Sequence, residues 1–418
     1  MQDRIIMTKE KNWKEKIKVY ALKNAVEHEG KAQEGSVISA LFHEGLKRED
    51  VKDVIKIVKE EVGKINKLTV QQQKKEFEKR EDEVSNRAER EGLPELPDAE
   101  KGVVMRFAPN PSGPLHIGHA ISVMPSYLYF KRYGGKFYIR LEDTDPETAF
   151  KDSYKSFKEE FDWLCPGVTA YIIQSDRMKW YYEYAEKLIK KNAAYVCTCS
   201  QEKFKKLKDK QQACPCRAIS IEENLERWNK MLDKKGYKEG GAVLRFKSDL
   251  QLENPALREF PLARIKLKAH PRQGKKYRVW PMMHLCVAVD DIEYKMTHII
   301  RAKEHRDNAE RQKMIYKVLG LEKQYPWTFF LGRYKFTDLV LSKRKLLAGV
   351  KAGDFTGFDD PNLPTLASLR KRGYLPEAFA KMAEDRGLSE VDKVLSKEDF
   401  FQLLDNYQKE AISEAGKK

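Results

Sequence analysis

The chain has 418 residues, and its 80 Lys and Arg against 64 Asp and Glu give a formal net charge of +16. This length suits about two to four domains, and the basic balance favours either a polyanionic partner or plain solubility. The longest apolar stretch, around residues 279–289, is too short to span a bilayer, and the N-terminus lacks the apolar segment of a signal peptide. We therefore expect a soluble, cytoplasmic protein with no membrane partner.

Residues 1–92 are predicted to be helical. Apolar residues recur at helical spacing from Val51 to Ile65, with charged residues on the opposite face. The run 71–90 is densely charged and has few apolar positions, which predicts a solvated helix or a helix that needs a partner. These helices are our candidate surface for a protein partner, and the Pro-containing residues 93–102 are the expected linker.

A βαβ unit is predicted next. The apolar strand 103–105 enters the turn Arg106-Phe-Ala-Pro-Asn-Pro-Ser-Gly-Pro-Leu-His-Ile-Gly-His119, and a helix is expected over 117–133. Two glycines then end the helix, and residues 136–141 form a second strand. In open parallel sheets, ligands bind at the carboxyl ends of the strands, where this turn lies.

The start of this helix is a candidate nucleotide site. Free backbone N–H groups and a partial positive charge at a helix N-terminus bind phosphate, and His116 and His119 stand there. Gly118 has no Cβ to block a nucleotide that lies against the backbone. A lone His-x-Gly-His string is most often ordinary loop chemistry, and it is the strand before it and the helix after it that favour a nucleotide site.

After the second strand the sequence is Glu142-Asp-Thr-Asp145-Pro146, in which Asp145 is predicted to cap a helix that begins at Pro146. Aromatic and apolar residues between Phe150 and Leu164 recur at spacings of four and three, which predicts one buried helix face. A second amphipathic helix is expected around residues 181–189.

Four of the six cysteines form two C-x-C pairs, separated by fourteen residues. This spacing suits a structural zinc ion held by four thiolates. Two disulfides or unliganded thiols are the alternatives, and disulfides are disfavoured in a reducing compartment. The candidate ligands are Cys197, Cys199, Cys214 and Cys216.

The segment 264–278 is strongly basic. Arg264, Lys266 and Lys268 alternate with apolar residues, so that one face of a strand would be basic and the other apolar. A basic ribbon suits a nucleic-acid backbone, whereas a solvated edge strand guarded by lysines is the alternative. The residues alone leave both interpretations open, and the charge favours nucleic acid.

The parallel sheet is predicted to resume with a strand over 285–291 and another over 297–305, followed by a helix over 308–319. Later segments, including 366–386 and 396–408, are predicted to form a compact helical domain.

The segment Arg106–His119 resembles the HIGH motif of class I aminoacyl-tRNA synthetases, and its flanking sequence is similar to that of glutamyl-tRNA synthetases of the archaeal and eukaryotic type. Residues Val340-Leu-Ser-Lys343-Arg344 stand where that family carries its KMSKS loop, and only Ser342 and Lys343 match closely. The resemblance implies an α/β fold with a Rossmann-like parallel-sheet catalytic domain that binds ATP together with Mg²⁺.

The same resemblance implies roles for individual residues. Those implied at the ATP phosphates are His116, His119 and Lys343, with Gly118 and Ser342 as further ATP contacts. Those implied at glutamate are Arg106 and Asn110 for the side-chain carboxylate, Glu142 for the α-ammonium group and Arg301 for the α-carboxylate.

The resemblance also implies a division of the chain. The expected parts are a helical N-terminal extension at 1–92, a linker at 93–102, the catalytic domain at 103–190 and 283–335, a zinc-containing tRNA acceptor-binding insertion at 191–282, and a helical stem-contact domain at 336–418. The family normally continues into two anticodon-binding β-barrels, which we expect this chain to lack.

The leading hypothesis is an ATP-dependent ligase that activates glutamate as glutamyl-adenylate and transfers it to the 3′ end of tRNA(Glu). A glutamate-activating paralogue that uses another tRNA or acceptor is one alternative. A non-catalytic tRNA-binding or scaffold protein is the other, and the retained motif residues argue against it.

Overall fold

The computed structural model describes residues 2–46, 50–84, 92–339 and 341–416. The chain divides into two compact units, Met1–Arg90 and Glu91–Lys418. Val340 of the expected KMSKS-like loop lies outside the described residues, as do the last residues of the charged run 71–90.

The first unit is a small group of helices with its own apolar core. Its helices are α1 (Gln2–Glu27), α2 (Glu34–His43), α3 (Val51–Ile65) and α4 (Val70–Glu78). The predicted helix from Val51 to Ile65 is confirmed. α4 covers the first part of the charged run and is held within the unit, because buried Gln73 donates to the carbonyl oxygens of Gly30 and Ile65, each at 2.9 Å.

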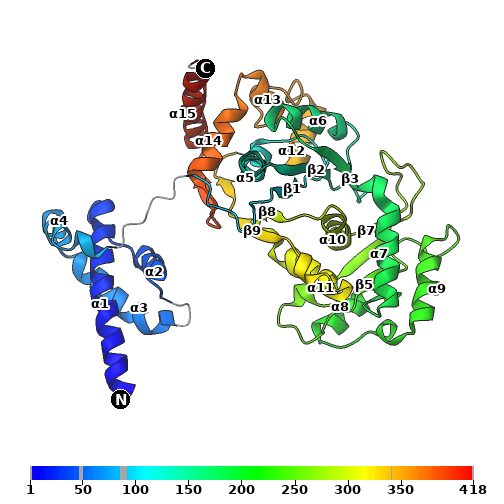
Figure 1. The fold of residues 1–418 in the computed structure, drawn as a ribbon, viewed down its shortest axis with the longest axis horizontal. Coiled ribbons are helices and arrows are strands. Elements are labelled where there is room, and N and C mark those ends of the chain that lie inside the picture. The colour runs from blue at the N-terminus through cyan, green and yellow to red at the C-terminus, as the bar shows by residue number, and fades with distance from the viewer. Residues whose placement is uncertain (1, 47–49, 85–91, 340, 417–418) are drawn as a thin grey trace. The chain divides into compact units, whose positions relative to one another are not determined.

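The second unit is built on parallel strands (Figure 1). The strands are β1 (Val103–Phe107), β2 (Gly135–Leu141) and β3 (Ala170–Ile173), paired in that order, and β8 (His298–Ala302), paired with β9 (Trp327–Leu331). The backbone N–H of Thr297, just before β8, donates to the carbonyl of Val104 at 2.9 Å. β1 therefore lies between β2 and β8, where the order of the strands switches direction.

Helices connect these strands in the α/β manner that the sequence predicts. They are α5 (Ile117–Tyr133), α6 (Ser153–Leu164), α7 (Met178–Lys190), α10 (Met283–Glu293) and α11 (Arg306–Leu319). α5 begins and ends where the sequence predicts, and Gly134 follows it with a φ of 69°, a backbone conformation that glycine adopts most easily.

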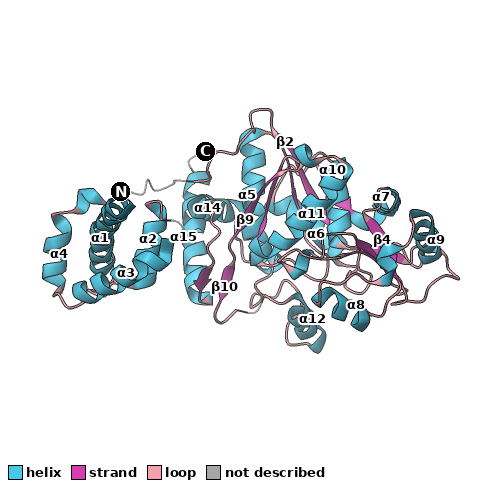
Figure 2. Cartoon of the chain, turned by 90° about the horizontal axis from the view of Figure 1, so that it is seen from below, coloured by secondary structure: helices cyan, strands magenta, loops and turns pink. Residues whose placement is uncertain are grey.

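An antiparallel sheet is inserted between α7 and α10. Its strands are β4 (Ala194–Cys197), β5 (Val243–Phe246), β6 (Pro261–Ile265) and β7 (Val279–Pro281), paired in that order, and α8 (Gln201–Asp209) and α9 (Ile221–Leu232) lie between β4 and β5 in sequence. Two views place α9 at the opposite end of the second unit from α14 (Pro376–Arg386) and α15 (Lys397–Ala415) (Figures 1 and 2).

The C-terminal elements are β10 (Tyr334–Phe336), α12 (Lys343–Ala352), α13 (Leu366–Lys371), α14 (Pro376–Arg386), β11 (Lys393–Leu395) and α15 (Lys397–Ala415). Leu366, Phe379 and Phe400 share one apolar core with Val103 and Met105 of β1, so these helices are built onto the parallel sheet. Among the described residues, no helix is both long enough and apolar enough to cross a membrane.

One predicted strand is wrong. Residues 285–291 form the middle of α10 instead of a strand. Every residue from His284 to Asp291 is buried, and a short apolar run with no exposed face does not distinguish a buried strand from a buried helix.

One predicted helix start is also wrong. The helix expected from Pro146 begins at Ser153. The Asp145 carboxylate forms other bonds, because it accepts from the backbone N–H of Glu147 at 3.2 Å and from Arg264 at 2.8 Å. The side chain expected to cap a helix therefore holds a turn and an ion pair instead.

Candidate active site

The N-terminus of α5 is closed by two imidazole rings. The His116 Nδ1 accepts from the backbone N–H of Gly118 at 3.2 Å, and the backbone N–H of His116 donates to the His119 Nδ1 at 3.1 Å. The two ring centroids are 4.0 Å apart. Since both Nδ1 atoms accept hydrogen bonds, each neutral ring carries its proton on Nε2, which leaves two N–H donors at this end of the helix.

These rings are neutral at ordinary pH. Burial lowers the pKa of His116 to about 3, and the nearby positive charge of Lys343 adds to the effect. Burial also lowers the pKa of His119 well below its ordinary value, with His116 and Lys343 contributing. The pair can therefore donate hydrogen bonds to a phosphate without carrying positive charge.

Gly118 packs closely against its neighbours. A Cβ at this position would lie 3.1 Å from the His116 ring and 3.7 Å from Leu341. A side chain at this position would therefore need the His116 ring to shift by a few tenths of an ångström.

The second signature segment reaches the first. Lys343 is the first residue of α12, and its ammonium group donates to the backbone carbonyl of Asn110 at 2.7 Å, across 233 positions of sequence. The same ammonium lies 5.2 Å from the centroid of the Phe157 ring. Burial lowers the pKa of Lys343 to about 8. Ser342 is the N-cap residue of α12, and its side chain makes no capping hydrogen bond.

The loop between β1 and α5 also forms backbone hydrogen bonds with residues at the start of α13 and just before it. The backbone N–H of Ile117 donates to the Pro364 carbonyl at 3.0 Å, and that of Leu366 donates to the Leu115 carbonyl at 3.1 Å. The loop that carries His116 is therefore fixed by backbone bonds to the C-terminal part of the unit.

A second group of polar side chains lies at the ends of β1, β2 and β8. Arg106 forms two hydrogen bonds of 3.3 Å with the Asp291 carboxylate. Asp291 also accepts from Arg140 at 2.6 Å, and Arg140 reaches Glu142 at 3.1 Å. Burial pushes the pKa of Asp291 upward, but the two arginines outweigh it and hold the pKa below its ordinary value. Arg106 and Glu142 are thus held in one buried ionic network.

Arg301 differs from Arg106 and Arg140, which both pair with the Asp291 carboxylate. Its Nη1 donates to the Gln312 side-chain oxygen at 2.9 Å, its Nε has no hydrogen-bond partner, and no carboxylate of the described residues forms an ion pair with it. Burial lowers its pKa to about 10. A buried cation without an anionic partner is costly, so this position favours an external carboxylate.

The structure brings the candidate residues together in two groups. His116, Gly118, His119 and Lys343 meet at the start of α5, and Arg106, Glu142 and Arg301 meet beside Asp291. The backbone carbonyl of Asn110 accepts from Lys343, and Asn110 itself is exposed.

Sequence reasoning missed Arg140 and Asp291 as members of the site. Arg140 is fully buried and lies alone among apolar residues of β2. A charge within the buried, largely apolar second half of the strand was the available signal, because such a charge needs a buried partner. The partner itself lies 151 residues away, which no local pattern reveals.

The four candidate zinc ligands form a cluster. Their sulfur atoms all lie within 4.8 Å of one another, with 3.8 Å between Cys197 and Cys214 and between Cys199 and Cys216. All four are free thiols, and three are buried. A tetrahedral zinc with Zn–S bonds of about 2.3 Å needs sulfur separations of roughly 3.8 Å, so the donor set fits the ion.

The basic segment 264–278 is largely engaged within the protein. Its strand ends at Ile265, and β6 lies between β5 and β7, so it is not an edge strand. Three of its bases form ion pairs with other segments. These pairs are Arg264–Asp145 at 2.8 Å, Lys266–Glu239 at 3.0 Å and Arg272–Asp176 at 2.7 Å. Lys275 and Lys276 remain exposed.

Comparison with known proteins identifies the class. Residues 102–408 match the family model for the catalytic domain of class I tRNA synthetases (E and Q). The chain therefore belongs to this family of class I tRNA synthetases.

Within the family, the chain is similar to archaeal glutamate–tRNA ligases over most of its length. The enzyme of Methanocaldococcus jannaschii is 43% identical over 390 residues, which cover 93% of this chain and 70% of that protein. The enzyme of Pyrococcus abyssi is 44% identical over 390 residues, covering 90% and 67%. A solved glutamate-tRNA synthetase from Elizabethkingia anophelis matches with a TM-score of 0.48 and 22% identity, covering 73% of this chain and 69% of that one, and the family assignment does not depend on it.

Proposed function

We propose that this chain activates glutamate with ATP as glutamyl-adenylate and transfers the glutamyl group to the 3′ end of tRNA(Glu). The observation that carries the proposal is the convergence of the two signature segments, in which the Lys343 ammonium lies on the loop that leads into His116 and His119. The similarity to archaeal glutamate–tRNA ligases supports glutamate as the amino acid and tRNA as the acceptor.

The chemistry follows from the charges. The glutamate α-carboxylate attacks the α-phosphorus of ATP, an acyl–phosphate bond forms, and pyrophosphate leaves with the bonding electron pair. Negative charge builds on the phosphate oxygens, so fixed donors at that place stabilise the transition state more than the ground state. The Nε2–H groups of His116 and His119 and the ammonium of Lys343 are those donors.

The nucleotide would lie against Gly118 and the start of α12 at Ser342, bringing its Mg²⁺ with it. No general base is needed in this step, because the attacking carboxylate is already an anion.

The glutamate site is assigned to the second group of residues. Arg301 takes the α-carboxylate, for which its unpartnered Nε supports a charge-assisted hydrogen bond. Glu142 takes the α-ammonium group. Arg106, held in place by Asp291, faces the side-chain carboxylate together with Asn110.

We further propose that the zinc-containing insertion at 191–282 binds the tRNA acceptor end and that residues 336–418 contact its stem. The catalytic domain is then 103–190 with 283–335, joined by the linker 93–102 to the helical extension 1–92. Zinc at Cys197, Cys199, Cys214 and Cys216 would hold the insertion together, because four thiolates around one ion leave no open coordination position.

The test is ATP–pyrophosphate exchange with glutamate, glutamine and aspartate compared, with and without tRNA. We expect exchange with glutamate only, followed by charging of tRNA(Glu). Exchange with glutamate but charging of a different acceptor identifies the paralogue, and tRNA binding without exchange under any condition identifies a non-catalytic protein.

A further inference from the structure

Arg301 is held by a neutral side chain. Its Nη1 donates to the Oε1 of Gln312 at 2.9 Å, which joins the end of β8 to the middle of α11. Gln312 is 1% exposed, and α11 packs through Ile315 and Tyr316 in one apolar core with α10 and the inserted sheet. The side chain that holds Arg301 is therefore itself fixed by its surroundings.

A carboxylate holds the two neighbouring arginines of the site. Arg106 and Arg140 both pair with Asp291, at 3.3 and 2.6 Å. An amide has nearly the shape of a carboxylate, so Gln312 differs from such a partner in charge and not in reach. It orients the Arg301 guanidinium and leaves the positive charge without compensation.

The same hydrogen bond fixes which way the amide faces. A guanidinium only donates, so the Gln312 Oε1 faces Arg301 and the Nε2 faces elsewhere. This Nε2 and the Arg301 Nε are buried, and neither has a hydrogen-bond partner among the described residues. Buried donors without acceptors are costly, so two of them on two bonded side chains favour an anionic ligand here.

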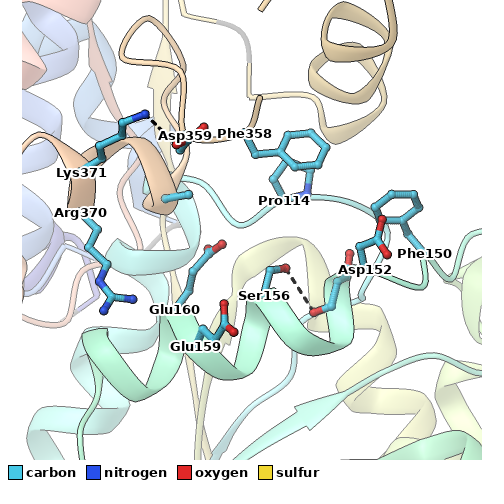
Figure 3. A pocket seen from close by; sticks show the side chains of 12 residues that line it. Pro114, Phe150, Asp152, Ser156, Glu159, Glu160, Phe358, Asp359, Arg370 and Lys371 are labelled. Carbon is cyan, nitrogen blue, oxygen red and sulfur yellow. Dashed lines mark hydrogen bonds and ion pairs between the residues drawn. The ribbon is translucent and has the colours of Figure 1, made fainter. Parts of the chain in front are cut away.

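The pocket shown in Figure 3 has the opposite character. This cavity of about 610 Å³ lies between α6 and α13, and its lining includes an acceptor without a hydrogen-bond partner, the Oε2 of Glu160. Acids also outnumber bases in the lining, with Asp152, Glu159, Glu160 and Asp359 against Arg370 and Lys371. An anionic ligand is therefore favoured beside Arg301 and not in this pocket.

We propose that Gln312 is a positioning residue of the amino-acid site, a neutral tether that orients the Arg301 guanidinium and leaves its charge for the α-carboxylate of glutamate. The inference rests on the proposed function, because Arg301 is assigned there to that carboxylate. It adds a residue from outside both signature segments.

Two substitutions separate this role from a purely structural one. Q312E keeps the acceptor oxygen but neutralises Arg301 and repels the carboxylate of the ligand, so we expect the KM for glutamate in pyrophosphate exchange to rise roughly a hundredfold. Q312M removes the acceptor without adding charge and should raise this KM about tenfold. The KM for ATP should stay unchanged in both. A purely structural tether gives the reverse order, with Q312E milder than Q312M, and that order overturns the inference.

The control for added charge is Q324E. Gln324 is exposed and ends the short helix η7 (Glu322–Gln324), which follows α11. Q324E should keep the KM for glutamate of the unsubstituted chain. An equal rise in Q324E and Q312E would show an effect of net charge alone and overturns the inference.

Binding of two ligands gives a readout without catalysis. Isoglutamine carries a neutral amide in place of the α-carboxylate of glutamate and keeps the α-ammonium and side-chain carboxylate groups. Calorimetric titration with each ligand gives the ratio of the two dissociation constants. The unsubstituted chain should prefer glutamate, and Q312E should lose most of this preference. Q312M serves where Q312E does not fold, because it should weaken glutamate binding more than isoglutamine binding. Equal weakening of both ligands in Q312M means that Gln312 serves only the fold, which overturns the inference.

The two proposals fail in different ways. If the unsubstituted chain binds glutamate but shows no exchange, the proposed function fails and the ratio of dissociation constants still tests Gln312. If exchange is normal and Q312E prefers glutamate as strongly as Q324E does, only the inference about Gln312 fails.

Discussion

At the scale of single residues, the candidate site depends on keeping groups in unusual charge states. The imidazoles of His116 and His119 are buried against the end of α5, where the partial positive charge of the helix and the Lys343 ammonium both disfavour a second proton. Each ring therefore serves as a neutral donor. Arg301 is the opposite case, because its buried Nε has no hydrogen-bond partner and no carboxylate of the described residues forms an ion pair with it.

The neutral state of His116 has a consequence for stability. Its pKa lies at about 3 in the folded chain, below the ordinary value of 6.5, so the unfolded chain binds the extra proton first as pH falls. The stabilising contribution is present above about pH 6.5 and is lost below it. The measurement is the free energy of unfolding in urea at pH 7 and at pH 5. We expect this free energy to fall between the two pH values by about 2 kcal/mol less in H116N than in the unsubstituted chain.

Asparagine keeps a side-chain acceptor at the N-cap, so this variant preserves the start of α5. The matched control is H28N, because His28 is exposed. Equal losses of stability between the two pH values in all three proteins would contradict the buried, neutral state of His116. These proteins are the unsubstituted chain, H116N and H28N.

Arg301 is expected to be irreplaceable by lysine. The planar guanidinium can bind Gln312 and a carboxylate at once, whereas an ammonium is a single point charge. R301K should therefore raise the KM for glutamate by roughly ten- to hundredfold, as expected for a lost hydrogen bond to a charged group. R306K is the control, since exposed Arg306 pairs with Glu390 and lies in the same region of the chain. An unchanged KM in R301K would place the α-carboxylate elsewhere.

At the scale of elements, the sequence predicts best where local chemistry alone decides. The bounds of α5 follow from its cap and the glycines after it, and those of α3 from its apolar spacing. The strand predicted at 285–291 fails, because the whole run is buried in α10 and the packing that makes it a helix comes from distant segments. For the same reason the sequence names Arg106 and Glu142 but not Asp291, which holds Arg106 and reaches Glu142 through Arg140.

The cysteine cluster makes a prediction for the inserted element. The first C-x-C pair ends β4, and the second lies between α8 and α9, so a shared ion would tie these parts together. We expect elemental analysis to find about one zinc per chain, and chelation to lower the melting temperature of the insertion. C199S and C216S should lose the ion, whereas C165A, outside the cluster, should keep it. Full occupancy in C199S and C216S would contradict a four-thiolate site.

At the scale of the whole molecule, the net charge does not say how many basic side chains are free to bind a partner. The formal charge is +16, yet Arg264, Lys266 and Arg272 in the most basic segment pair with carboxylates of the chain itself. Composition correctly identifies an excess of bases, but only the fold shows which of them are free. In this segment the exposed bases include Lys275 and Lys276, in the turn after His270.

These two lysines therefore carry the final prediction, which rests on the proposed role of the insertion in tRNA binding. Each phosphate contact contributes about one to the slope of log affinity against log salt concentration. The double variant K275Q/K276Q should weaken tRNA binding and reduce that slope by about two, measured by filter binding across a salt series. K67Q/K74Q gives the same net charge by changing exposed lysines of the first unit. Equal slopes in the two double variants would mean that tRNA responds to total charge and not to this turn.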